Sequence, residues 1–97
     1  MRYEFHSEAL AEYQEAARFY AEREPGLERH FVRAVEDAIQ HLSDVPDRCR
    51  VLDEDVRRCL THVFPYAVLY TIETDYVLVV AVMHCSREPG YWKGRIG

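Results

Sequence analysis

The chain has 97 residues, of which 48% are hydrophobic and 30% charged, a balance that indicates one globular domain over residues 1–97. Its longest apolar stretch, residues 77–83, is far shorter than the roughly 20 residues of a membrane-spanning helix, and residues 1–5 lack the apolar core of a secretory signal. Three widely spaced cysteines do not match a secreted disulfide scaffold, so we expect a cytoplasmic protein with reduced thiols.

The net charge of −5 is distributed unevenly along the chain. Residues 1–55 carry 14 Asp and Glu against 7 Arg, whereas residues 56–97 carry 3 Asp and Glu against 5 Arg and Lys. The first half is therefore acidic and the second half mildly basic. A dedicated nucleic-acid-binding protein usually has a stronger basic excess, so the composition weakens a function based on RNA binding without excluding it.

The first half of the chain predicts one short strand and two helices. Residues 2–6 alternate polar and apolar side chains, as a half-buried strand does. Ser7 is placed to cap a helix over residues 8–23, and a second apolar stripe predicts another helix over residues 27–42. The short Pro-Gly connection requires the two helices to form an antiparallel hairpin. The apolar face of the first helix is expected to contain Leu10, Tyr13, Ala17 and Tyr20.

The second half of the chain predicts a sheet. Residues 43–55 are polar and rich in turn formers, which indicates a loop. Residues 56–63, 67–73 and 76–84 are rich in Val, Leu, Ile, Tyr and Thr, which indicates three strands. The last of these is apolar on both faces, so we expect it to lie centrally in the sheet.

These elements predict an α+β fold with the order β-α-α-β-β-β. In this fold the helical hairpin packs on one face of a mostly antiparallel, four-stranded sheet. The opposite face is expected to remain open to solvent and to be the place where a protein partner binds.

Several short stretches carry a resemblance to a known family. They are FHSEA at residues 5–9, DVRR at residues 55–58, FPY at residues 64–66, and the closing HCSREPGYW at residues 84–92. In this order and spacing, they are similar to the RelE/ParE superfamily of type II toxins, particularly to the toxins called plasmid-stabilisation proteins. The resemblance covers essentially the whole chain.

The resemblance implies a toxin that a cognate antitoxin neutralises in a heteromeric complex. One branch of the family poisons DNA gyrase, and another cleaves messenger RNA on the ribosome. Because the chain is acidic and contains a single lysine, Lys93, we expect gyrase as the target and no intrinsic catalysis. Ribosome-dependent mRNA cleavage and a non-toxic binding module are the alternatives. No cofactor, metal, small-molecule substrate or membrane partner is expected.

A nuclease of this family would need a group that moves the 2′-hydroxyl proton and cations that hold the phosphate. The positions that match the family's usual placement of such groups are His84, Arg87, Arg58, Arg57 and Tyr91. Neighbouring residues of a strand point to opposite faces, so at most one of Arg57 and Arg58 can serve the open face.

Each remaining candidate also has a structural interpretation. His84 can terminate a strand, and Arg87 and Tyr91 can attach the C-terminal segment to the domain, with Trp92 expected to pack. The ridge of acids on the first helix, Glu8, Glu12 and Glu15, is expected to be a solvated face. The spacing of the histidines and cysteines in the second half, Cys59, Cys85, His62 and His84, does not match that of known metal-ligand motifs. Neither Cys59 nor Cys85 has a recognisable activating partner that would make it a nucleophile.

Overall fold

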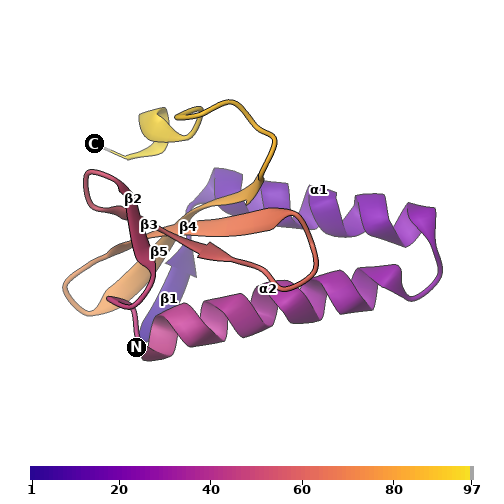
Figure 1. Ribbon diagram of the computed structural model, residues 1–97, viewed down its shortest axis with the longest axis horizontal. Coiled ribbons are helices and arrows are strands. Elements are labelled where there is room, and N and C mark those ends of the chain that lie inside the picture. The colour runs from indigo at the N-terminus through magenta and orange to yellow at the C-terminus, as the bar shows by residue number, and fades with distance from the viewer. Residues whose placement is uncertain (97) are drawn as a thin grey trace.

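The computed structural model describes residues 1–96 and shows a helical hairpin packed against one face of a five-stranded sheet (Figure 1). The elements are β1 (Arg2–Phe5), α1 (Ser7–Arg23), α2 (Leu27–Asp44), β2 (Arg50–Asp53), β3 (Val56–Leu60), β4 (Tyr66–Ile72), β5 (Tyr76–His84) and the short 3₁₀ helix η1 (Lys93–Arg95). The strands lie in the order β1-β5-β4-β3-β2, with β1 parallel to β5 and the other neighbours antiparallel. The predicted α+β class is confirmed. Residues 1–96 contain no helix with the length and apolar character that crossing a bilayer requires.

The predicted count of four strands is wrong, because β2 lies within residues 43–55, which were expected to be a loop. This strand of four residues pairs with β3 and forms an edge of the sheet, with most of its side chains exposed. Its turn into β3 places Glu54 at a φ of 51°. A short, exposed edge strand has no alternation between core and solvent, so the periodicity of the sequence does not reveal it.

Both helices form as predicted, and most of the apolar face expected on α1 contacts the core: Ala17 is buried, and Tyr13 and Tyr20 pack against the core. The exception is Leu10, expected in the same stripe, which is 41% exposed. The N-cap is His6 rather than Ser7, since the His6 Nδ1 atom accepts a hydrogen bond from the Glu8 N–H at 3.1 Å. The stripe expected on α2 is confirmed: its buried apolar residues are Phe31, Ala34, Val35, Ala38, Ile39 and Leu42.

A β-bulge in β5 decides which of its side chains face the helices. The pairing of β5 with β4 shifts by one residue, which leaves Val80 without a partner position. As a result, Val79 and Val82 both belong to the core beneath the helices, although three positions separate them. Beyond the bulge, His84 has the same parity as Val82 and therefore lies on the helix side of the sheet.

The sheet face opposite the helices is not open, and the prediction that it would be is wrong. The segment after β5 returns across this face (Figure 1), where Trp92 packs with Val56, Leu69 and Val80. Trp92 is 3% exposed, which confirms its expected packing role. Only part of the face stays accessible, as at Leu60 near the end of β3, which is 59% exposed.

We expect Trp92→Ala to lower the free energy of unfolding by about 3–5 kcal/mol, because it leaves a cavity between the C-terminal segment and the sheet. Urea denaturation followed by circular dichroism measures this change. Leu60→Ala is the matched control, and at its exposed position we expect a change of about 0.5 kcal/mol or less. A loss for Trp92→Ala no larger than that of the control would contradict the packing of the C-terminal segment.

Candidate functional site

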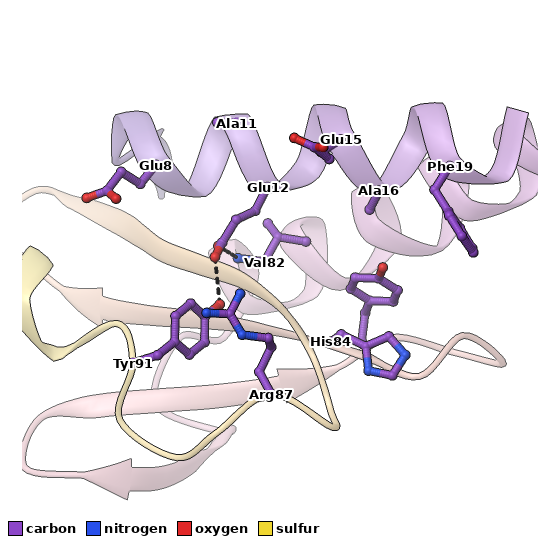
Figure 2. A pocket seen from close by; sticks show the side chains of 11 residues that line it. Glu8, Ala11, Glu12, Glu15, Ala16, Phe19, Val82, His84, Arg87 and Tyr91 are labelled. Atoms are coloured by element: carbon purple, nitrogen blue, oxygen red, sulfur yellow. Dashed lines mark hydrogen bonds between the residues drawn. The ribbon is translucent and has the colours of Figure 1, made fainter. Parts of the chain in front are cut away.

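A groove of about 480 Å³ lies between α1 and the segment that follows β5 (Figure 2). Helix α1 forms one wall, with Phe19 at one end (Figure 2). Strands β4 and β5 and the C-terminal segment supply the rest. The lining residues are Glu8, Ala11, Glu12, Glu15, Ala16, Phe19, Tyr66, Val82, His84, Arg87 and Tyr91.

Three of the five residues singled out in the sequence meet in this groove: His84, Arg87 and Tyr91. The other two, Arg57 and Arg58, are outside it. They lie on opposite faces of β3, as the alternation of a strand requires. The fold therefore groups the candidates from the end of the chain and separates those from its middle.

Arg57 has a structural role in the turn before β2. Its Nη1 atom donates hydrogen bonds to the carbonyl oxygens of Asp47 and Cys49, at 3.1 and 2.8 Å. These bonds hold the segment that precedes the edge strand β2 against β3. Arg58 lies on the opposite face of the sheet, where its register partner on β4 is Leu69.

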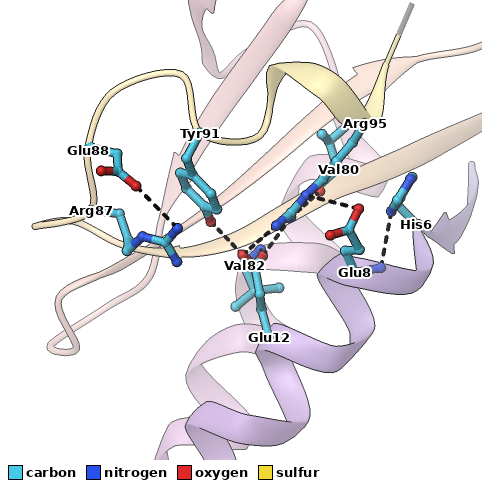
Figure 3. A network of polar contacts seen from close by, with 9 residues as sticks. All are labelled: His6, Glu8, Glu12, Val80, Val82, Arg87, Glu88, Tyr91 and Arg95. Atoms are coloured by element: carbon cyan, nitrogen blue, oxygen red, sulfur yellow. Dashed lines mark hydrogen bonds and ion pairs between the residues drawn. The ribbon is translucent and has the colours of Figure 1, made fainter.

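Glu12 is the most heavily hydrogen-bonded side chain at the groove (Figure 3). Its Oε1 atom accepts from the Val82 N–H at 3.0 Å and from Arg95 Nη1 at 2.9 Å. Its Oε2 atom accepts from the Tyr91 hydroxyl at 2.7 Å and from Arg95 Nη2 at 2.9 Å. The side chains of Glu12 and Arg95 are only 17% and 10% exposed. The paired forks of the two groups compensate for the cost of removing both charges from water.

The expectation that Glu12 belongs to a solvated ridge is therefore wrong, although its neighbours on that ridge, Glu8 and Glu15, are exposed. A signal was present in the sequence: Glu12 lies between Ala9 and Ala16 at helical spacing, on the buried face of α1. The residue that compensates its charge, Arg95, is remote in the sequence, and sequence reasoning missed it. Tyr66 and Phe19 were also not anticipated as groove residues.

The contacts of Tyr91 fix its protonation state. Burial, and next the hydrogen bond to Glu12, raise the pKa of Tyr91 far above the ordinary value of a tyrosine. The hydrogen bond to Glu12 also raises the pKa of the Arg95 guanidinium. The Tyr91 hydroxyl is therefore protonated at neutral pH and donates a hydrogen bond to Glu12, which attaches the C-terminal segment to α1.

His84 occupies the end of the groove opposite Tyr91 (Figure 2). Its Nδ1 atom accepts a hydrogen bond from the Ser86 N–H at 3.0 Å and lies 2.7 Å from the Ser86 hydroxyl oxygen. This pattern assigns the ring proton of the neutral imidazole to Nε2. The ring packs edge-on against Tyr66, with centroids 5.1 Å apart.

Arg87 is a partly exposed cation on the rim of the groove. Its guanidinium lies 3.8 Å from the centre of the Tyr91 ring, and its Nη2 atom is 3.6 Å from a Glu88 carboxylate oxygen. The side chain remains 47% exposed. Across the groove, Glu8 and Glu15 contribute acidic groups from α1. Apolar walls with charges of both signs at the rim suit an amphipathic peptide segment.

The cysteines and histidines of the second half do not form a site together. Cys59 is buried in the core beneath the helices, whereas Cys85 is exposed. Within residues 1–96, no three side chains of His, Cys, Asp and Glu gather closely enough to hold a metal ion.

Comparisons with known proteins place this chain in a family. The family model described as "ParE toxin of type II toxin-antitoxin system, parDE" matches residues 3–89. The chain belongs to the ParE toxin family. The resemblance found in the sequence is thereby confirmed.

A solved structure described as "Chromosomal ParDE TA system from P. aeruginosa" has a fold similar to that of this ParE family member. The TM-score is 0.66 at 13% sequence identity, over 87% of this chain and 95% of that chain. No curated protein sequence matches the chain significantly. The matched residues of the family model end before Tyr91, Trp92 and Arg95, which hold the C-terminal segment in place.

We expect Glu12→Ala to destabilise the protein by about 3–5 kcal/mol, because it leaves the buried Arg95 guanidinium without its partner. Glu15→Ala on the same helix is the matched control, with an expected change of about 0.5 kcal/mol or less. Urea denaturation of both variants, and of Arg95→Ala alone and combined with Glu12→Ala, gives the coupling energy. Additive losses in the double variant would show that the two side chains do not act as a pair.

Proposed function

We propose that this ParE family member is a toxin that a cognate antitoxin holds inactive and that acts by binding DNA gyrase. The main support is that Tyr91 donates a hydrogen bond to Glu12 and that Arg57 donates hydrogen bonds to backbone carbonyls. These bonds occupy two of the groups that a nuclease would use, and they support a protein that acts by binding. The proposal places the toxin in the cytoplasm, where gyrase acts.

The groove beside α1 is the surface that we propose for the antitoxin. Its apolar walls and mixed charges fit a segment that is disordered alone and folds as it binds. Phe19 is 46% exposed at the edge of the groove, with Arg23 stacked on its ring at 4.5 Å. Exposed aromatic residues of this kind frequently supply a large share of the binding energy at protein interfaces.

The charge of the chain supports gyrase over the ribosome. A nuclease that enters a site walled by RNA phosphates gains affinity from each cation that it brings. This chain has a net charge of −5 and one lysine. Its Lys93 is paired with Asp53 at 2.7 Å.

One observation favours the ribosome-dependent nuclease as the second candidate. His84 and Arg87 line the same groove, so that an imidazole able to move a proton lies near a cation able to hold a phosphate. A chain that shows neither activity would be the non-toxic binding module.

We expect the product of the adjacent short reading frame to co-elute with this protein and to bind it in calorimetry. Phe19→Ala should weaken that binding at least about tenfold, because it removes an aromatic wall of the groove. Leu10→Ala is the matched control, since Leu10 is an exposed apolar residue of α1 outside the groove. Equal affinities for the two variants would show that the antitoxin binds a different surface. The absence of any complex would contradict the proposal that an antitoxin binds this protein.

Induction in bacteria without the antitoxin separates the two targets. Gyrase poisoning should trap cleaved DNA, induce the DNA-damage response and cause filamentation, whereas nuclease action should give codon-positioned mRNA cuts that require ribosomes. We expect the first result. Arg87→Ala and His84→Ala should each abolish growth inhibition, because they remove polar groups from the groove, and should change the melting temperature by only a few degrees. Arg18→Ala, on α1 outside the groove, is the control.

A further inference from the structure

The register of the β2–β3 hairpin brings two cysteines face to face. Arg50 pairs with Arg58 and Val51 with Arg57 in the antiparallel ladder. Continuing this register one position beyond the start of β2 brings Cys49 opposite Cys59. Residues directly opposite one another in such a ladder have Cβ atoms about 4.5–5.5 Å apart. Both cysteines are free thiols.

The two thiols are also in contact on the helix side of the sheet. Cys59 is 8% exposed and belongs to the core beneath the helices, and Cys49 is half-buried against that same core. Cys49 lies close enough to Cys59 and Tyr70 to help burial raise the pKa of both groups. The Cys59 thiol itself donates to the Ala38 carbonyl at 3.9 Å, and the Tyr70 hydroxyl donates to the Pro46 carbonyl at 2.6 Å. The hydrogen bonds from Arg57 to the carbonyls of Asp47 and Cys49 hold the segment before β2 against β3.

We propose that Cys49 and Cys59 form an intramolecular disulfide when the protein meets an oxidised low-molecular-weight thiol, with glutathione disulfide as the representative oxidant. A disulfide requires Cα atoms about 4.4–6.8 Å apart, and opposite residues of an antiparallel pair are about 4.5–5.5 Å apart. The sulfurs therefore reach bonding distance with only a small movement of β2. That movement is available because β2 is an edge strand with an irregular register between Val51 and Asp53.

The reaction proceeds in two thiol–disulfide exchanges. The Cys49 thiolate attacks one sulfur of glutathione disulfide, which forms a mixed disulfide and releases one glutathione thiolate. The Cys59 thiolate then attacks the Cys49 sulfur and expels the second glutathione. The protein loses two protons and two electrons in total, and one glutathione disulfide becomes two glutathione thiols.

The second exchange is the slow step. Burial, and next the contact with Cys49, raise the pKa of the Cys59 thiol to about 12. Between pH 7 and pH 9 the thiolate fraction of Cys59 therefore rises about tenfold for each pH unit, and the rate of ring closure rises with it. The mixed disulfide on Cys49 should accumulate near neutral pH and convert faster as the pH increases.

The bond would fasten the free edge of the sheet. Strand β2 is held by its pairing with β3 and, through Asp53, by the ion pair with Lys93 of the C-terminal segment. A covalent link at the start of β2 would close a short loop and keep this edge in place. We expect the melting temperature of the oxidised protein to exceed that of the reduced protein by roughly 5–15 °C.

The test uses the full chain in a Cys85→Ser background. Cys85 is exposed, and no Lys or Arg separates it from Cys59, so trypsin would leave both in one peptide. After incubation with glutathione disulfide at pH 8, we expect an intact mass lower by two hydrogen atoms, a tryptic peptide pair joined through Cys49 and Cys59, and the higher melting temperature. Reductant should reverse all three.

Cys49→Ser in the same background is the control, and it should show neither the mass loss nor the higher melting temperature. The proposal is overturned if the chain with both cysteines stops at the mixed disulfide at every pH from 7 to 9. It is also overturned if the joined peptides come from a covalent dimer. Because the readouts are mass and melting temperature, the result is independent of the toxin's target.

Discussion

The ion pair between Glu12 and Arg95 is the interaction on which the arrangement of the groove depends. Strand β1 pairs with β5 only as far as Val79, so the next part of β5 has no strand on that side. Glu12 accepts from the N–H of Val82 there, and Arg95 donates to the carbonyl of Val80 at 3.1 Å. The two side chains thus take the place of a missing strand, which buried backbone groups require. Because Arg95 follows Trp92 closely, the same pair also holds the covering of the opposite sheet face.

The groove is built partly from residues that match the family model and partly from residues beyond the match. Residues 3–89 match the family model, whereas Tyr91 and Arg95 lie beyond it. The α1 wall of the groove therefore lies within the matched residues, and Tyr91 on the facing wall lies outside them. Tyr91 carries the Arg87 guanidinium on its ring and donates from its hydroxyl to Glu12, so it joins the rim of the groove to α1.

The features that could be predicted from the sequence are those that appear as a pattern along one helix or strand. The stripe of α2, the doubly apolar β5 and the packing of Trp92 were all readable, because periodicity reports burial along one helix or strand. The bulge at Val80 was not readable, and it moves His84 to the helix side of the sheet. The spacing of Glu12 from Ala9 and Ala16 indicated its burial, but its partner Arg95 lies 83 positions away, and pairing across such a separation leaves no local pattern.

The covered sheet face leaves little of that face accessible to a binding partner. An open face would have allowed a guest to spread over the strands, but Trp92 and its neighbours already fill much of that area. The membership in the ParE family therefore rests on the family match over residues 3–89, and not on an open face. The groove between α1 and the C-terminal segment, in contrast, stays accessible. Its two sides are held together by Glu12, which bonds to Val82, Tyr91 and Arg95 across it.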